Sequence, residues 1–323
     1  MLAFLLAIAL SFIPGALFAY VLYSLDRFEK EPPRLVLACF AWGALVAAAG
    51  AFIGNTLFGI TVYAFTGDEQ LAHALGITLS APVLEELVKG LAVLLVFLRF
   101  RHEFDTVLDA VVYAGITALG FAATENVVYL YFNAYLEHGM GAMLATFAAR
   151  VVLAGWLHPI FTACFGIGLA LARLSPSPVV RVVAPLAGLL LAMLLHATHN
   201  ALVTLFSAGG YLLALAIHWL EWLAMAALIL WALLRQRRWM RTYLPEEVRL
   251  GTLSDRECAI ACSLRSNFRA RRRGPHARRL LRALARLAII RHHIARAVAT
   301  PDAPARLVQL RAEIIALRAT GKV

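Results

Sequence analysis

The sequence predicts an all-helical, polytopic membrane protein with about seven transmembrane helices. Of its 323 residues, 62% are hydrophobic and only 15% are charged, whereas soluble domains average about 45–50% and about 25%. The apolar residues also fall into runs of twenty or more, a length that matches a hydrocarbon layer of about 30 Å. Because backbone groups in lipid must be satisfied within the chain, each run is predicted to be a helix.

Seven apolar segments make up this membrane part. They cover residues 1–24, 35–65, 71–98, 106–131, 143–174, 179–206 and 210–234. The second and fifth are longer than one span needs, which predicts tilt or an interfacial extension. The first lacks the basic start and the cleavage site of a secretory signal, so we expect it to remain a span.

The loops predict the orientation. One set of loops contains eleven basic residues, whereas the opposite loops, at residues 66–70, 133–141 and 207–210, contain none. The eleven are Arg27, Lys30, Arg34, Arg99, Arg101, Arg173, Arg181, Arg235, Arg237, Arg238 and Arg241. The positive-inside rule then places the N-terminus outside and the C-terminus in the cytoplasm.

The charge divides the chain into a membrane domain, residues 1–234, and a basic cytoplasmic tail, residues 235–323. The tail has 21 Lys/Arg against 6 Asp/Glu, and the first 234 residues have 9 against 13. In the tail, Arg alternates with Leu and Ile at helical spacing after Pro275, which predicts an amphipathic helix on anionic lipid. Arg-rich runs also bind nucleic acid, but a tail tethered beside a bilayer favours lipid.

Charged side chains within the spans are candidates for function, because burying each one costs several kcal/mol. The third span contains Glu85, Glu86 and Lys89, and Glu85 lies about 20 Å from the cytoplasmic end at about 1.5 Å per residue. Lys89 can reach either carboxylate from one helix face. This arrangement is typical of a general base. The alternative is an ion cluster that only packs helices.

Further polar groups occur in the next three spans. In the fourth, Phe121 and Glu125 share a face, with the Asn126 amide beside the carboxylate, and Asp109 near the cytoplasmic end could pair with Arg99 or Arg101. The candidates from the fifth and sixth spans are Arg150, His158, His196, His199 and Asn200.

In the sixth span, His196 and Asn200 share a face, and His199 is turned by about 60°. A single membrane histidine is often only a satisfied hydrogen-bonding group. A set of Glu and His serves as a base with polarising donors, or as metal ligands. His218 and Glu221 in the last span form a further pair that ranks lower.

The order of these motifs is similar to that of a known family. EExxK (Glu85, Glu86, Lys89), FxxxEN (Phe121, Glu125, Asn126), His158 and HxxxN (His196, Asn200) together resemble the PrsW family of intramembrane proteases. That family belongs to the superfamily of CAAX prenyl endopeptidases and bacteriocin-immunity proteins. The resemblance covers roughly residues 35–205 and implies a multi-pass protease of a bacterial (inner) cell membrane, with its motif core at 71–206. It implies that a glutamate-activated water attacks a peptide bond.

Carried onto this chain, the resemblance makes Glu85 or Glu86 the base. Glu125, His158 and His196 would complete the site, and Asn200 would polarise the carbonyl or stabilise the oxyanion. The supporting residues would be Lys89, Phe121, Asn126, Arg150 and His199. CAAX relatives have His where this chain has Glu125, which is the residue of the PrsW branch.

Cofactor and partners follow from the same resemblance. The chain has no HExxH motif, so no cofactor is assigned. A divalent metal such as zinc is the alternative, with Glu85, Glu86, His158 and His196 as its ligands. The implied substrate is a single-span membrane protein, such as an anti-sigma factor cut during a stress response, and nucleic acid is not an expected partner.

Two other functions fit buried Glu and His residues. A proton-coupled transporter or channel also uses such relays, but it would more often show inverted repeats with paired broken helices, which this sequence lacks. A non-catalytic scaffold of the same fold would be expected to have lost a motif residue, and all of them are present.

Overall fold

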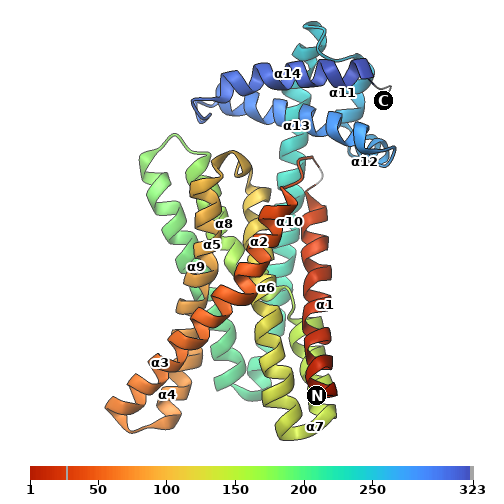
Figure 1. Ribbon diagram of the computed structural model, residues 1–323. Helices are drawn as coiled ribbons and strands as arrows, with labels where there is room; N and C mark the ends of the chain where they lie inside the picture. The colour runs from red at the N-terminus through yellow and green to blue at the C-terminus, as the bar shows by residue number, and fades with distance from the viewer. Residues whose placement is uncertain (27, 321–323) are drawn as a thin grey trace.

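The computed structural model describes residues 1–26 and 28–320, with the side chains of residues 207 and 208 left aside. Arg27, one of the loop arginines counted above, and residues 321–323 of the predicted tail lie outside the described residues. Within the described part every regular element is a helix (Figure 1). The elements are α1 (Leu2–Leu25), α2 (Pro33–Ala41), α3 (Ala48–Thr66), α4 (Glu69–Leu75), α5 (Ala81–Arg99), α6 (Val107–Val127), α7 (Leu136–Phe147), α8 (Leu157–Arg173), α9 (Pro178–Leu205), α10 (Ser207–Arg249), α11 (Asp255–Cys262), α12 (Leu264–Arg271), α13 (Pro275–Ala295) and α14 (Ala303–Thr320).

The predicted fold class is confirmed. Among the described residues, five helical stretches are long and apolar enough to cross a membrane. They are Leu2–Leu25, Pro33–Thr66, Val107–Arg173, Pro178–Leu205 and Gly209–Arg249. Helix α5, which carries the buried charges, lies in the bundle beside them (Figure 1). All seven predicted segments are helical, while the number of crossings and the orientation stay predictions.

Short π-helical turns join several of these helices. They are η1 (Trp42–Ala47), η2 (Gly76–Ser80), η4 (Val128–Tyr135) and η5 (Ala148–Leu153). Such turns often occur at functional sites. Here η1 lies directly on the central helix α6, because a Cβ added at Gly43 would lie only 1.9 Å from the carbonyl oxygen of Thr117. The hydroxyl of Thr124 on α6 donates to the carbonyl of Ala44 in η1 at 2.7 Å.

The long fifth predicted segment is two helices rather than one tilted span. The chain leaves helical hydrogen bonding at residues 154–156 and restarts at α8. His158 therefore lies in the first turn of α8, just beyond a break in the backbone. A second bend occurs at Gly139, whose φ of 79° a residue with a side chain rarely adopts.

Asp109 has a role that the sequence did not predict. Its carboxylate accepts hydrogen bonds from the backbone of Asp105 and Thr106 and from the Thr106 hydroxyl, at 2.6–2.8 Å. The expected pairing with Arg99 or Arg101 is therefore wrong, because both oxygens are engaged in capping the start of α6.

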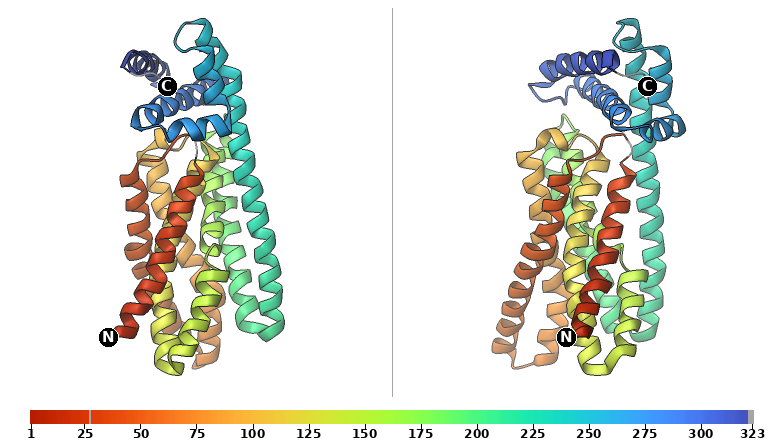
Figure 2. Two further views of the ribbon diagram at one scale, coloured as in Figure 1. Left: turned by 90° about the vertical axis from the view of Figure 1, so that its right-hand side faces the viewer. Right: turned by 45° about the vertical axis from the view of Figure 1, so that its right-hand side comes forward.

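The basic tail folds as a unit of its own helices at one end of the bundle (Figure 2). Helix α10 runs without a break from the bundle into this unit, where α11–α14 pack around it. The apolar face of α13, with Leu280, Leu284 and Leu287, is buried in that packing. The helix is amphipathic as predicted, but the partner of its apolar face in this structure is protein.

Polar contacts attach the tail to the loops of the membrane part. Arg271 donates to the carbonyl of Phe28 at 2.7 Å, and Arg286 pairs with Glu29 and with Glu103. From the bundle side, Arg173 donates to the carbonyl of Val298 at 2.6 Å. The tail therefore covers the end of the bundle opposite the N-terminus (Figure 1).

Candidate active site

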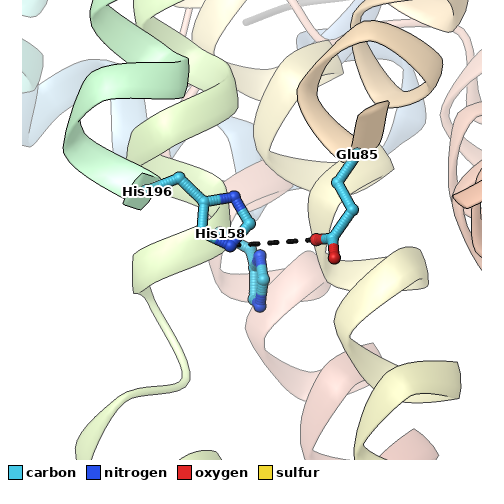
Figure 3. Close-up of side chains that lie close together, drawn as sticks. All are labelled: Glu85, His158 and His196. Atoms are coloured by element: carbon cyan, nitrogen blue, oxygen red, sulfur yellow. Dashed lines mark ion pairs between the residues drawn. The ribbon is translucent and has the colours of Figure 1, made fainter. Parts of the chain in front are cut away.

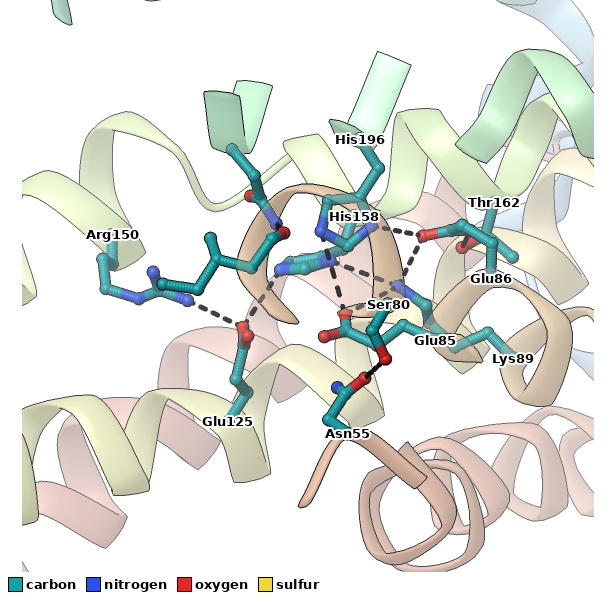
Figure 4. A network of polar contacts seen from close by, with 12 residues as sticks. Asn55, Ser80, Glu85, Glu86, Lys89, Glu125, Arg150, His158, Thr162 and His196 are labelled. Carbon is teal, nitrogen blue, oxygen red and sulfur yellow. Dashed lines mark hydrogen bonds and ion pairs between the residues drawn. The ribbon is translucent and has the colours of Figure 1, made fainter. Parts of the chain in front are cut away.

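Four helices bring the predicted carboxylates and histidines together inside the bundle (Figure 4). Helix α5 carries Glu85, Glu86 and Lys89, α6 carries Glu125, α8 carries His158 and α9 carries His196. Residues up to 111 positions apart in the sequence thus share one site. A motif within a single helix could not predict that these residues lie together.

Glu86 is fully engaged by protein groups. Its Oε1 lies 2.6 Å from Nζ of Lys89 and 3.1 Å from Nδ1 of His196, and its Oε2 accepts a hydrogen bond from the Thr162 hydroxyl at 2.8 Å. The side chains of Glu86 and Lys89 are both 0% exposed. Glu86 therefore holds a cation and a histidine in place. Thr162 was missed by the sequence analysis, although it follows His158 by one helical turn on α8.

Glu85 differs from its neighbour because one of its buried oxygens has no hydrogen-bond partner. That atom, Oε2, lies 3.7 Å from Nζ of Lys89 and 3.8 Å from Nε2 of His196 (Figure 3). Glu85 also lines a cavity of about 1070 Å³. Among the site carboxylates, Glu85 is therefore the one with an oxygen free to accept a hydrogen bond from a ligand.

Glu125 is held by two cation-capable groups. Nη2 of Arg150 lies 2.7 Å from its Oε2, and Nε2 of His158 lies 3.1 Å from the same oxygen. Arg150 also donates from Nε to Oδ1 of Asn126 at 3.1 Å and lies over the ring of Tyr129. Arg150 and Asn126 thus form a support for Glu125, with Asn126 acting as acceptor.

Aromatic rings pack beneath these polar groups. Nζ of Lys89 lies 4.4 Å from the centre of the Phe121 ring, which also packs against His158. On the other side, Phe161 stacks on His196 with ring centres 5.2 Å apart. The rings exclude water from one side of the site and restrict the orientation of both histidines.

Asn200 and His199 lie at the edge of this arrangement. One Asn200 amide hydrogen is donated to the carbonyl of Ile77 in η2 at 2.9 Å, which leaves the second hydrogen available. His199 turns toward α10, where its Nδ1 lies 3.0 Å from Nε2 of His218. His218 in turn lies 3.2 Å from Glu221. His199 therefore contacts the His218–Glu221 pair of α10 and not the site carboxylates.

Three site residues offer ligand atoms for a divalent metal ion, and one of these atoms, Nδ1 of His158, lies 3.3 Å from Nζ of Lys89. Glu85, His158 and His196 each offer one ligand atom, and these atoms lie within 4.8 Å of one another. Two imidazoles and one carboxylate are a donor set found in catalytic zinc sites. The second nitrogen of each histidine faces a carboxylate, Glu86 for His196 and Glu125 for His158, as is usual for metal-bound histidine.

A groove leads from these residues to the surface of the bundle. It has a volume of about 1070 Å³ and is lined by α3, by η2, and by the end of α6 with η4. Glu85 and Glu125 both lie in its wall. A membrane bundle with a buried carboxylate–imidazole site that opens into a groove has the architecture of an intramembrane hydrolase.

Comparison with known proteins identifies the class of hydrolase. Residues 31–234 match the family described as PrsW family intramembrane metalloprotease. Protease PrsW of Geobacillus kaustophilus (strain HTA426) is 30% identical over 212 residues, covering 66% of this chain and 86% of the relative. Protease PrsW of Bacillus subtilis (strain 168) is 27% identical over 209 residues, 65% of this chain and 88% of the relative.

The chain therefore belongs to the PrsW family and is an intramembrane protease, which confirms the resemblance found in the sequence. The family match ends at residue 234, so the helices of the tail lie outside it. No solved structure matches this chain.

Proposed function

We propose that this protein hydrolyses a peptide bond of a membrane-spanning protein, with Glu85 as the carboxylate that faces the substrate. The observation that supports this most directly is the buried Oε2 of Glu85, which has no hydrogen-bond partner, on a residue that lines the groove. An unpartnered buried acceptor is unfavourable unless something else binds there. A water molecule held by this oxygen would lie where a peptide entering the groove could be attacked.

In this proposal the residues around Glu85 divide the remaining tasks. Glu85 accepts the proton of the attacking water, as a general base does. His158 lies close enough to pass a proton to the leaving amine, and Glu125 fixes its ring. The second amide hydrogen of Asn200 is a candidate donor to the oxyanion. Glu86 keeps His196 and Lys89 in place.

A metal ion would have its ligands in Glu85, His158 and His196. When bound there, a divalent ion such as Zn²⁺ would polarise the carbonyl and lower the pKa of a coordinated water. Glu86 and Glu125 would then orient the two histidines through their second nitrogens.

The experiment compares two conservative changes of buried glutamates in the full chain. Glu85→Gln and Glu221→Gln are each co-expressed with candidate single-span substrates, and cleavage is followed on immunoblots. We expect Glu85→Gln to abolish cleavage and Glu221→Gln to retain it, because the polar contact of Glu221 is with His218 on α10 and not with a site carboxylate. Normal cleavage by a folded Glu85→Gln variant would refute the proposal.

The substrate and the location are proposed from the family. Within the class of single-span membrane proteins, an anti-sigma factor is the candidate that the sequence resemblance implies, and the inner membrane of a bacterium is the proposed location. The division into a protease domain, residues 1–234, and a separate tail is proposed on the extent of the family match.

For the tail we propose binding to anionic lipid through α12 and the start of α13. Six exposed arginines lie within eleven residues of Phe268 in the sequence, and Phe268 itself is 51% exposed. They are Arg265, Arg269, Arg272, Arg273, Arg278 and Arg279. Each such residue contributes about 1 kcal/mol at an anionic surface.

Hydrogen exchange of the full chain in nanodiscs tests this binding. We expect slower exchange over α12 in phosphatidylglycerol than in phosphatidylcholine, and we expect Arg272→Gln with Arg273→Gln to reduce the difference. Equal exchange of wild type in both lipids would contradict the proposal.

A further inference from the structure

One face of α3 and of the turn before it lines the groove over its whole length. The lining positions on this side recur every three or four residues, as expected for one face of a helix. They include Leu45, Ala49, Phe52, Thr56, Ile60 and Tyr63. From the first to the last of these, the face is about 27 Å long at about 1.5 Å per residue. That length is close to the hydrocarbon thickness of about 30 Å.

The opposite face of α3 fixes its height relative to the active-site helix. A Cβ added at Gly54 would lie 2.8 Å from the Leu84 side chain, and one at Gly50 would lie 3.5 Å from Val88. Since the two helices run antiparallel, Glu85 lies level with about Gly54. It therefore lies near the middle of the groove rather than at either end.

The composition of the groove walls suits an apolar chain segment. Phe52 and Ile60 are large apolar side chains that are 69% and 60% exposed, on a helix long and apolar enough to cross a membrane. The charged lining residues are Glu69, Glu85 and Glu125, and the lining contains no Lys or Arg. A small polar ligand would require a more enclosed site with convergent polar groups.

We propose that this groove binds the membrane-spanning segment of the substrate, lying along α3 and presenting a peptide bond to Glu85 near its middle. The acidic lining favours an uncharged segment with basic flanks over one with acidic residues. This inference rests on the proposed function in one respect, namely that the ligand is a peptide chain. It adds the place of binding, the length of chain held and the residues that contact it.

Photo-crosslinking in the full chain tests the place of binding without depending on catalysis. The Glu85→Gln variant carries p-benzoylphenylalanine at Phe52 or Ile60 in the groove, or at Leu190, which is 66% exposed on α9 outside the groove. The probe is a tagged single-span protein whose Leu/Ala segment of about 20 residues is flanked by lysines. We expect about tenfold more crosslinking from the groove positions. Equal crosslinking from Leu190 would overturn the proposal.

A pair of glycine substitutions tests whether the groove is used during cleavage. A Cβ at Gly59, in the groove, and one at Gly141, on α7 outside it, would each meet nothing within 4 Å. Gly59→Trp therefore starts a bulky side chain in open space within the groove, and Gly141→Trp is the matched control. We expect Gly59→Trp to reduce both crosslinking and substrate cleavage about tenfold, with Gly141→Trp close to wild type.

The outcomes separate this inference from the protease mechanism. Groove-specific crosslinking without any hydrolysis by wild type would refute the proposed function and leave the groove assignment standing. Hydrolysis that Gly59→Trp leaves unchanged would refute the groove alone. If Gly59→Trp does not fold, the crosslinking comparison still decides the question.

Discussion

The adjacent residues Glu85 and Glu86 predict different outcomes for the same substitution. Glu86→Gln removes the carboxylate that lies 2.6 Å from Nζ of Lys89, a cation with no exposed surface. Removing one partner of a buried ion pair costs about 3–5 kcal/mol, because the remaining charge is left uncompensated. Glu85→Gln leaves the closer pair intact and removes a charge whose Oε2 had no hydrogen bond. We expect this change not to lower the free energy of unfolding, because it removes a buried charge that no close cation compensates.

For activity we expect the opposite order, with the larger loss in Glu85→Gln. Loss of a general base lowers the rate by about 10²–10⁴-fold, which we expect for Glu85→Gln. A double variant, Glu86→Gln with Lys89→Met, removes both charges and should recover most of the stability that Glu86→Gln loses. This double variant shows whether the stability lost in Glu86→Gln comes from the uncompensated charge of Lys89.

Both quantities can be measured on the full chain. The free energy of unfolding is obtained in detergent micelles with increasing denaturant, and the initial rate is obtained with a single-span substrate in proteoliposomes. Equal destabilisation by Glu85→Gln and Glu86→Gln would refute the assigned roles. A double variant no more stable than Glu86→Gln alone would refute the ion-pair argument.

Three further predictions concern the support of the site, the metal and the tail. Arg150→Gln should lower the cleavage rate about tenfold, an effect of about 1.4 kcal/mol, because Glu125 loses one of its two cation-capable partners; an unchanged rate would contradict this. Elemental analysis should find about one zinc per chain after zinc loading, and a chelator or His196→Ala should remove it; a metal-free wild type would refute the metal site. Burial raises the pKa of Asp105, at the contact with the tail, to about 7. Its proton is therefore held more tightly in the docked state, so the stability of wild type relative to Asp105→Asn should fall as the pH rises from about 4 to about 7. Proteolysis of the tail at several pH values measures this difference, and a pH-independent difference would contradict it.

Hydropathy predicted the helices but not their interruptions. Each apolar run is long enough to leave no alternative to a helix in lipid. The π-helical turns and the break at residues 154–156 leave no mark in hydropathy. One of them, η1, lies where the chain packs closely, with Gly43 against α6. The amphipathic pattern of α13 was also visible, but the same pattern serves a lipid surface and a protein partner. In this structure the apolar face of α13 packs against protein, because α10 extends far enough beyond the bundle to reach it.

For the candidate site, the sequence predicted which residues take part but not how they are arranged. Helical spacing placed Lys89 within reach of both neighbouring carboxylates, and the distances are 3.7 Å to Glu85 and 2.6 Å to Glu86. Spacing could not assign different roles to these two carboxylates, since that depends on how α8 and α9 are rotated toward α5. The same rotation brings Thr162 to Glu86 and turns His199 away.

The balance of charge explains why Glu85 is the residue to which the chemistry points. The described site contains three carboxyl groups, Glu85, Glu86 and Glu125, and two basic side chains, Lys89 and Arg150. The close ion pairs are Lys89 with Glu86 at 2.6 Å and Arg150 with Glu125 at 2.7 Å. One negative charge therefore remains, and geometry assigns it to Glu85. Since an uncompensated buried charge is strongly unfavourable, the site favours uptake of positive charge at Glu85. A proton taken from water and a divalent metal ion both meet that need, and both belong to peptide hydrolysis.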